Sequence, residues 1–256
     1  MFWKNKIVLL TGASSGIGEA LAVEIANRGA TVGLLARRAE MLREISGKIE
    51  QNGGIARNFA VDITDADAVA DAARNLRNEF GRIDVLIANA GISGSNSKAR
   101  NFEADAVTEV INTNLIGAVN SVSAVLPQML EQKNGQLVAI SSLAGFRGLP
   151  KSAAYCASKA GMTAFFESVR LDVQTRGVAV TIIQPGFIKT PLTAGREVAM
   201  PFLMELDDAI PHFLNAIEKR KKFAAFPWQL ATLVRAAQIF PALFYDKIAG
   251  RARFRE

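Results

Sequence analysis

Short apolar runs alternate with longer segments of helical periodicity along most of the chain. The runs are four to eight residues long, contain many β-branched residues and lack the polar alternation of a half-exposed strand, which is typical of strands buried on both faces. Between them, apolar residues recur every three to four positions, as in helices that cover a sheet. Strands are predicted at 6–10, 30–36, 55–61, 83–88, 136–141, 178–184 and 222–226, and helices at 19–28, 38–50, 65–80, 105–132, 152–174 and 228–240.

This alternation predicts an α/β protein whose parallel sheet is doubly wound, with helices on both faces. No change in composition marks a domain boundary before about residue 190, and no internal repeat is present, so residues 1–256 are interpreted as a single domain. Ligands in such sheets bind at the carboxyl ends of the strands. The residues expected there are Ala36, Asp62, Asn89, Ser142 and Pro185.

A glycine-rich turn follows the first strand and leads directly into a helix and a second strand. The turn reads Thr11-Gly12-Ala13-Ser14-Ser15-Gly16-Ile17-Gly18. Glycines allow the backbone to approach a pyrophosphate, and the helix N-terminus presents free N–H groups and the positive end of a dipole. In this strand–turn–helix–strand context the pattern predicts a dinucleotide site.

The end of the second strand bears on which dinucleotide binds. An acidic residue at that position would accept hydrogen bonds from the ribose hydroxyls of NAD. This chain has Ala36 there, followed by Arg37 and Arg38. A guanidinium can bind a 2′-phosphate with two hydrogen bonds, which favours NADP(H). The alternative is that the two arginines only begin a solvated helix.

The helix expected at 152–174 carries Tyr155 and, four residues later, Lys159. Positions i and i+4 share one face of a helix. An ammonium beside a phenol stabilises the phenolate and lowers its pKa from about 10. Taken alone, the pair would more often be an exposed Tyr–Lys contact on an amphipathic helix, and only the rest of the chain favours a catalytic role.

Together these motifs resemble the short-chain dehydrogenase/reductase family over residues 5 to 190. Thr11-Gly12-x-x-x-Gly16-Ile17-Gly18 is similar to its cofactor turn and Asn89-Ala90-Gly91 to its sheet-stabilising element. Pro185-Gly186, Ile188 and Thr190 are similar to the segment that holds the nicotinamide carboxamide, and Asp62 to the residue that contacts adenine. Asn114, Ser142, Tyr155 and Lys159 resemble the catalytic tetrad. The resemblance implies a Rossmann-type fold.

It further implies hydride transfer between NADP(H) and a carbonyl, with Tyr155 as general acid and Ser142 bound to the substrate oxygen. Lys159 would lower the pKa of Tyr155 and bind the nicotinamide ribose, while Asn114 would hold a water that links Lys159 to solvent. On chemistry alone either Ser141 or Ser142 could act, and spacing favours Ser142. Many NADP-using relatives carry a basic residue where this chain has Ser15, so cofactor choice rests on Arg37 with Arg38 as helper. A homodimer or homotetramer is also implied.

Beyond Pro191 the resemblance fades. Residues 191–226 contain several apolar side chains, Leu192 and Phe202 among them, and are interpreted as a substrate lid for a hydrophobic ketone or aldehyde such as a steroid, acyl or sphingoid compound. Residues 227–256 are expected to form a C-terminal helical extension. Its helix is too short to span a membrane. It could pack on the core, on a second subunit or on a membrane surface.

Composition limits the remaining alternatives. The chain is 50% hydrophobic and carries a net charge of +6, part of it in two clusters, 219–222 and Arg251, Arg253 and Arg255. The clusters suggest an anionic membrane surface rather than nucleic acid, because no basic recognition helix is present. One cysteine, Cys156, and one histidine, His212, exclude a Cys/His zinc site and an internal disulfide, so no metal is expected. No signal peptide is apparent at the start, and a cytoplasmic protein is expected, with peripheral membrane contact as a variant. The alternatives for function are an NAD(H)-using alcohol dehydrogenase and a non-catalytic dinucleotide-binding regulator.

Overall fold

The computed structural model describes residues 2–94, 103–195, 199–239 and 246. Seven parallel strands form one sheet in the order β3-β2-β1-β4-β5-β6-β7. Because β2 and β3 lie on one side of β1 and the later strands on the other, the sheet is doubly wound, as predicted. The strands are β1 (Ile7–Thr11), β2 (Thr31–Ala36), β3 (Ile55–Ala60), β4 (Val85–Ala88), β5 (Gly135–Ile140), β6 (Val178–Pro185) and β7 (Phe223–Phe226).

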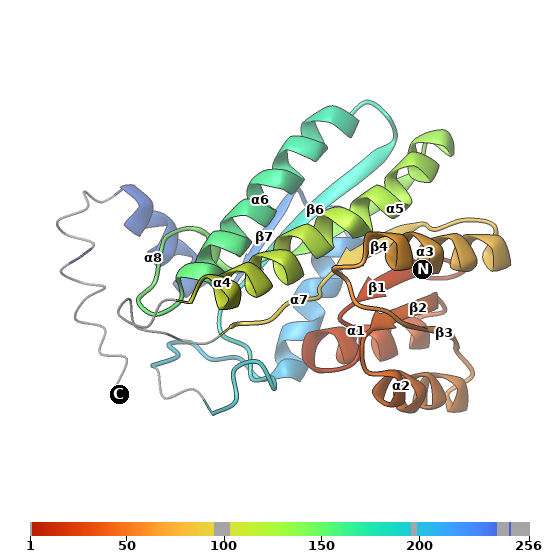
Figure 1. Ribbon diagram of the computed structural model, residues 1–256, viewed down its shortest axis with the longest axis horizontal. Helices are drawn as coiled ribbons and strands as arrows, with labels where there is room; N and C mark the ends of the chain where they lie inside the picture. The colour runs from red at the N-terminus through yellow and green to blue at the C-terminus, as the bar shows by residue number, and fades with distance from the viewer. Residues whose placement is uncertain (1, 95–102, 196–198, 240–245, 247–256) are drawn as a thin grey trace.

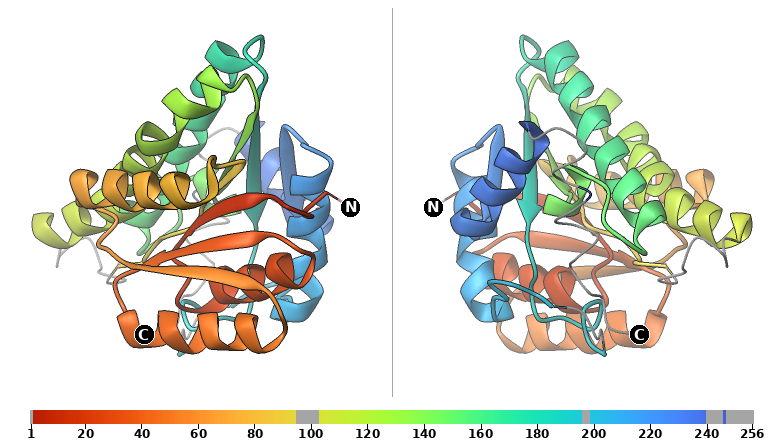
Figure 2. Two further views of the ribbon diagram at one scale, coloured as in Figure 1. Left: turned by 90° about the vertical axis from the view of Figure 1, so that its right-hand side faces the viewer. Right: turned by 90° about the vertical axis from the view of Figure 1, so that its left-hand side faces the viewer.

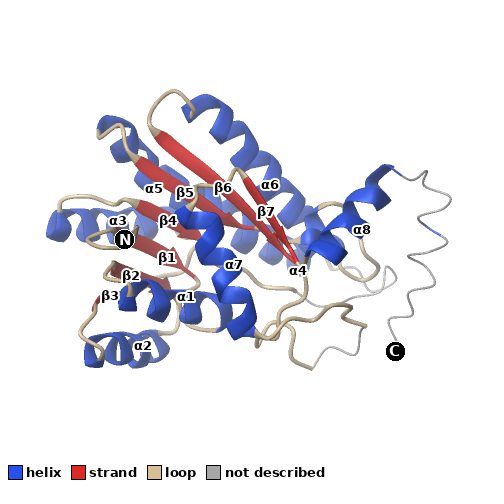
Figure 3. Ribbon diagram, turned by 180° about the vertical axis from the view of Figure 1, so that it is seen from behind, coloured by secondary structure: helices blue, strands red, loops and turns tan. Residues whose placement is uncertain are grey.

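Helices cover both faces of this sheet (Figures 1 and 2). One layer consists of α1, α2 and α7, which lie in front of the strands in Figure 3. The other consists of α3, the long α4–α5 helix and α6. The bounds are α1 (Gly16–Asn27), α2 (Ala39–Gln51), α3 (Ala66–Phe80), α4 (Ala104–Ile111), η2 (Asn112–Ile116), α5 (Gly117–Glu131), η3 (Leu143–Gly145), α6 (Ala153–Val173), α7 (Leu206–Glu218) and α8 (Trp228–Ile239).

The continuous apolar runs form strands because both of their faces are covered. Every residue of β1, β2, β4 and β5 is buried. Two apolar clusters result, one on each face of the sheet, with Leu21 and Phe213 in the first and Phe166 in the second. Burying large apolar side chains contributes about 1.5–3 kcal/mol each. The predicted fold class is confirmed.

The long helix that follows β4 differs from the prediction of one regular helix over 105–132. It is interrupted by a π-helical turn, η2, between α4 and α5. A π turn holds one more residue than an α turn and shifts the side chains that follow around the axis. Asn114 lies in this turn and is completely buried. By length and composition the stretch 104–131 could cross a membrane, but its buried face packs on the sheet as core helices do.

Part of the expected C-terminal extension lies outside the described residues, and so does a polar segment, 95–102, before the long helix. In the extension this applies to Leu243, Phe244, Tyr245 and Ile248 and to the arginines at 251, 253 and 255.

Candidate active site

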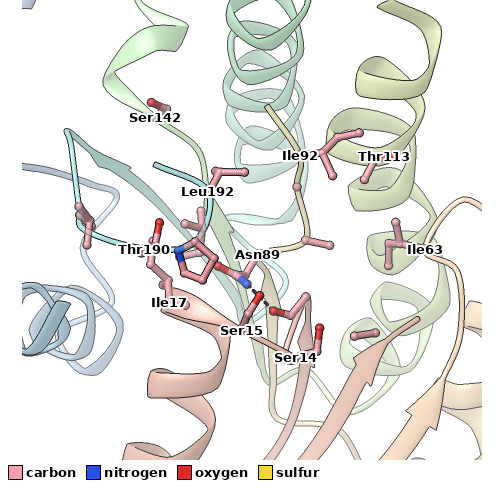
Figure 4. A pocket seen from close by; sticks show the side chains of 18 of the residues that line it. Ser14, Ser15, Ile17, Ile63, Asn89, Ile92, Thr113, Ser142, Thr190 and Leu192 are labelled. Carbon is pink, nitrogen blue, oxygen red and sulfur yellow. Dashed lines mark hydrogen bonds between the residues drawn. The ribbon is translucent and has the colours of Figure 1, made fainter. Parts of the chain in front are cut away.

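A cavity of about 430 Å³ opens at the carboxyl ends of the central strands, where the strand order reverses. It brings together almost every residue singled out in the sequence, and Figure 4 shows several of their side chains around it. Gly18 and Asn114 are the two expected site residues that do not line it. Those that do are Gly12, Ser14, Ser15, Gly16, Ile17, Arg37, Arg38, Asp62, Asn89, Ala90, Gly91, Ser142, Tyr155, Lys159, Pro185, Gly186, Ile188 and Thr190.

The glycine-rich turn is shaped by a close approach to the end of β4. Gly12 has φ +65°, and a Cβ at this position would lie 2.7 Å from the Cα of Ala90. A Cβ on Gly18 would overlap the carbonyl oxygen of Gly12. Both positions therefore require glycine. The turn leaves its N–H groups and the start of α1 facing the cavity, which is the cradle a pyrophosphate needs.

Asn89 and Thr11 fasten this turn to β4. The side-chain amide of Asn89 donates to the carbonyls of Thr11 at 3.0 Å and Gly12 at 3.2 Å. The hydroxyl of Thr11 accepts from the main-chain N–H groups of Asn89 and Ala90, each at 3.1 Å. Asn89 thus holds together the two strand ends that flank the switch point of the sheet.

The two arginines after β2 have different partners. Arg38 donates through Nη2 to the hydroxyls of Ser14 and Ser15, each at 2.8 Å, so its guanidinium lies against the glycine-rich turn. Arg37 is exposed and lies 3.8 Å from a carboxylate oxygen of Asp62. The guanidinium of Arg38 and the hydroxyls of Ser14 and Ser15 form a cradle that a 2′-phosphate would fit.

Asp62 follows β3 at the edge of the cavity. Its carboxylate accepts from the main-chain N–H of Thr64 at 2.9 Å and from the Thr64 hydroxyl at 2.8 Å. These hydrogen bonds, followed by the charge of Arg37, hold the pKa of Asp62 below its ordinary value. The group is therefore a fixed anion at neutral pH.

Tyr155 and Lys159 lie on successive turns near the N-terminus of α6, and both face the cavity. The Lys159 side chain is buried, and its ammonium donates to the carbonyl oxygen of Ile140 at 2.8 Å. The same nitrogen lies 5.9 Å from the centroid of the Tyr155 ring. Burial lowers the pKa of Lys159 to about 8.

The two consecutive serines after β5, Ser141 and Ser142, have different hydrogen-bond partners. The chemistry of the residues alone could not decide which of them acts on the substrate. Ser141 donates to the main-chain carbonyl of Lys159 at 3.0 Å and shares a hydrogen bond with the Thr163 hydroxyl. The Ser142 oxygen accepts from the main-chain N–H of Ala144 at 3.1 Å, which leaves its hydroxyl proton for donation. Ser142 is therefore the better donor to a ligand.

Asn114 lies behind the cavity wall rather than in it. Its side-chain amide exchanges two hydrogen bonds with the main chain of Ile92, at 2.8 and 2.9 Å, and donates to Ser158 at 3.0 Å. A Cβ on Gly91 would lie 3.2 Å from the Asn114 oxygen and 3.5 Å from the Lys159 nitrogen. Asn114 and Lys159 therefore both lie against Gly91, on the side to which a side chain there would project.

Several lining residues were not anticipated. Thr193 accepts a hydrogen bond from the Thr190 main chain and donates to the Ile188 carbonyl at 2.7 Å, so it shapes the segment after β6. The Thr-x-x-Thr spacing in the sequence was the available signal. Ile63 and Thr113 carried no such signal, because their place at the cavity depends on tertiary packing.

The start of the segment expected to bind substrate, residues 191–193, lines the cavity. Main-chain hydrogen bonds between Met204 and both Phe187 and Lys189 close the base of the lid region, and Lys189 pairs with Glu205 at 3.0 Å. Three lid residues, Leu192, Phe202 and Leu203, are at least 39% exposed despite being apolar. Leu192 also lines the cavity.

The fold, the glycine cradle and the paired tyrosine and lysine define a dinucleotide-binding α/β protein of the Rossmann type. Residues 6–200 match the sequence model of the short chain dehydrogenase family. The chain belongs to this family, whose members are oxidoreductases that bind a nicotinamide dinucleotide.

Two relatives in sequence agree with this assignment. The chain is 43% identical, over 97% of its length and 98% of the other chain, to an uncharacterized oxidoreductase of Myxococcus xanthus. It is 35% identical to a fatty acyl-CoA reductase of Acinetobacter baylyi, over 91% of this chain and 80% of that protein.

Two solved structures have the same fold. One is a metagenomic short-chain oxidoreductase in complex with NADP, at a TM-score of 0.75 and 30% identity, covering 88% of this chain and 96% of the other. The other is an NAD+-bound xylitol dehydrogenase, at a TM-score of 0.80 and 25% identity, covering 88% of this chain and 98% of the other. The two neighbours bind different dinucleotides, so likeness of fold does not choose the cofactor.

Proposed function

We propose that this protein is an NADPH-dependent carbonyl reductase that acts on a hydrophobic ketone or aldehyde. The observation that carries the proposal is the meeting of two groups of residues at one cavity. Tyr155, Lys159 and Ser142 line it, and so does the cradle that Arg38 forms with Ser14 and Ser15 of the glycine-rich turn. When bound, NADPH supplies a hydride.

The residues of the chain would stabilise and protonate the carbonyl oxygen. Negative charge develops on this oxygen during reduction, and the hydroxyls of Ser142 and Tyr155 would donate hydrogen bonds to it. Tyr155 would then transfer its proton as general acid. The ammonium of Lys159 near the ring favours the phenolate, which makes the proton easier to lose.

Proton return to Tyr155 is assigned to Lys159 and the region of Asn114. The side-chain amide of Asn114 is committed to Ile92 and Ser158. We therefore assign it the task of holding the Gly91–Ile92 backbone beside the lysine, where a water linking Lys159 to solvent would be bound.

The choice of NADPH is supported by the cradle after β2. Arg38 is oriented by Ser14 and Ser15, so little further ordering is needed for it to bind a 2′-phosphate, and Arg37 lies next to it with an exposed guanidinium. We propose that both arginines contact the phosphate, with Arg38 the better placed. Asp62 remains the proposed contact for adenine.

A long acyl-type carbonyl is the proposed substrate class. In the proposed lid, Leu192 lines the cavity, and Phe202 and Leu203 are exposed apolar side chains on the same segment before α7, which an apolar chain would bury. The fatty acyl-CoA reductase that resembles this chain acts on such a group. Steroid and sphingoid carbonyls are the competing classes.

We propose that the protein is a homo-oligomer in the cytoplasm. We further propose that α8 packs on its own subunit rather than on a second one. Leu230 and Ala231 on α8 are buried against Leu143 of the same chain. The basic residues 219–222 precede β7, at the opposite end of that strand from α8, so they do not border the helix. A peripheral membrane contact would therefore involve α8 and the lid without this cluster.

The experiment is to follow NADPH absorbance with long-chain acyl, steroid, sphingoid and aromatic carbonyls. Oxidation that is fastest with the long-chain acyl compounds is expected. Turnover with NADH but not NADPH would overturn the cofactor assignment. NADPH binding without turnover of any carbonyl would favour a dinucleotide-binding regulator instead.

A further inference from the structure

Helix α8 begins two residues after β7 and lies beyond residues 6–200, the part that matches the family. In Figures 1 and 3 it lies at the carboxyl end of the sheet, beside the loop that leads from β5 to α6. This loop, residues 143–152, joins Ser142 to the helix that carries Tyr155. Whatever fixes the loop therefore affects both proposed catalytic hydroxyls.

One face of α8 contacts the backbone on both sides of the site. Leu230 and Ala231, 7% and 4% exposed, form an apolar cluster with Leu143, the residue directly after Ser142. The Cδ2 atom of Leu230 lies 2.9 Å from where a Cβ on Gly186 would be. Leu230 thus fills the space between the serine loop and the Pro185–Gly186 segment.

The C-terminal half of α8 binds the same loop through polar contacts. The side-chain amide of Gln238 donates to the carbonyl of Phe146 at 3.0 Å, and the Arg147 guanidinium donates to the carbonyl of Ala237. The Arg235 guanidinium lies 5.7 Å from the centre of the Phe146 ring. Two consecutive loop residues are therefore tied to the last turns of α8.

The beginning of the loop, η3, packs on α6, but the residues after it are less buried. Leu149 is 36% exposed, and Phe146 and Arg147 are only partly buried. A segment with few buried apolar side chains opens at low free energy. A shift of about 1 Å at a catalytic group can lower a rate by as much as ~100-fold. The contacts with α8 are thus sufficient to matter for catalysis.

We propose that α8 is a positioning element of the active site, which holds the 143–152 loop so that Ser142 and Tyr155 converge on one carbonyl oxygen. Leu230 is the central positioning residue and Gln238 the second. The catalytic part of this inference rests on the proposed reductase function. The structural part does not.

The test compares Leu230→Ala with Leu233→Ala, a matched change on the same helix, because Leu233 is 62% exposed. Leu230→Ala is expected to lower kcat for carbonyl reduction about 10-fold while the Kd for NADPH stays within about twofold. Leu233→Ala is expected to leave both within about twofold. Leu230→Met, which conserves volume, is expected to restore most of kcat. An unchanged kcat in Leu230→Ala, or equal losses in the two alanine variants, would overturn the proposal.

Gln238→Ala removes a polar contact without making a cavity, so it covers the case in which Leu230→Ala does not fold. Amide hydrogen exchange within 143–152 gives a readout that needs no substrate. Faster exchange there in Gln238→Ala or Leu230→Ala, but not in Leu233→Ala, is expected even if no carbonyl is turned over. Exchange equal to wild type in Gln238→Ala and in folded Leu230→Ala would contradict the positioning role independently of the reductase function.

Discussion

The ammonium of Lys159 lies 5.9 Å from the centroid of the Tyr155 ring and is held there by the carbonyl of Ile140. Ile140 ends β5, so the sheet itself fixes the cation relative to the phenol. The next residue, Ser141, donates to the main-chain carbonyl of the same lysine. Two consecutive residues at the end of β5 therefore hydrogen-bond to the side chain and to the main chain of Lys159.

Replacing Tyr155 with Phe tests the proposed acid directly. The change removes one hydroxyl and keeps the ring, so the Kd for NADPH is expected to stay within about twofold of wild type. kcat is expected to fall by about 10²–10⁴, the usual contribution of a positioned acid. Stopped-flow absorbance and NADPH fluorescence measure the two quantities. Substantial remaining turnover would show that another group donates the proton.

Lys159→Met tests the burial of the ammonium through stability. Because the pKa of Lys159 is lowered from 10.5 to about 8, the charged lysine destabilises the folded state relative to the unfolded state by about 3 kcal/mol at pH 7. Loss of the hydrogen bond to Ile140 offsets about 1 kcal/mol. The variant is therefore expected to be more stable than wild type by about 2 kcal/mol in urea unfolding at neutral pH.

The same variant makes a signed prediction about pH. Between pH 8 and 10.5 the unfolded wild type holds the lysine proton while the folded protein has lost it, so wild-type stability rises with pH over this window. Below pH 8 both states are charged, and the advantage of the variant should be constant. An advantage that does not shrink above pH 8 would mean that the lysine is not perturbed by burial.

Alanine substitutions of the two arginines separate their roles in cofactor choice. Arg38→Ala removes the guanidinium held by Ser14 and Ser15. It is expected to raise the Kd for NADPH by about 10-fold or more with little effect on the Kd for NADH. Arg37→Ala is expected to show the same selectivity at a smaller magnitude, because Arg37 is also paired with Asp62. Arg74→Ala, on the exposed face of α3, serves as the control. Equal losses for NADPH and NADH in both variants would undo the phosphate assignment.

Cys156 provides a probe of the rigidity of α6 next to the proposed acid. Its thiol is 6% exposed, and burial raises its pKa. Alkylation by iodoacetamide at about pH 8 is expected to be slower in the native protein than in urea by on the order of 100-fold, because the helix must open first. Rapid native labelling, followed by mass spectrometry, would show that the start of α6 opens readily.

The sequence alone was sufficient for the strands and for most of the cavity lining. Continuous apolar runs that alternate with helices indicate a parallel sheet covered on both faces, and the carboxyl ends of such strands meet at one edge. This placed Asn89 and Ser142 at one edge of the sheet, and the resemblance to the family added Gly12 and Tyr155 to the same site. Local backbone requirements, such as glycine at Gly12, leave a direct mark on the sequence.

What only the tertiary structure decided depends on contacts between distant segments. The π turn at Asn114 requires the main chain of Ile92 as its partner, and the distinct environments of Ser141 and Ser142 require α6. The sequence also left the place of α8 open among core, second subunit and membrane, and the structure packs it on Leu143 and beside Gly186. Apolar periodicity records that a helix face is buried, but not against which surface, because burial stabilises a side chain nearly equally wherever water is excluded.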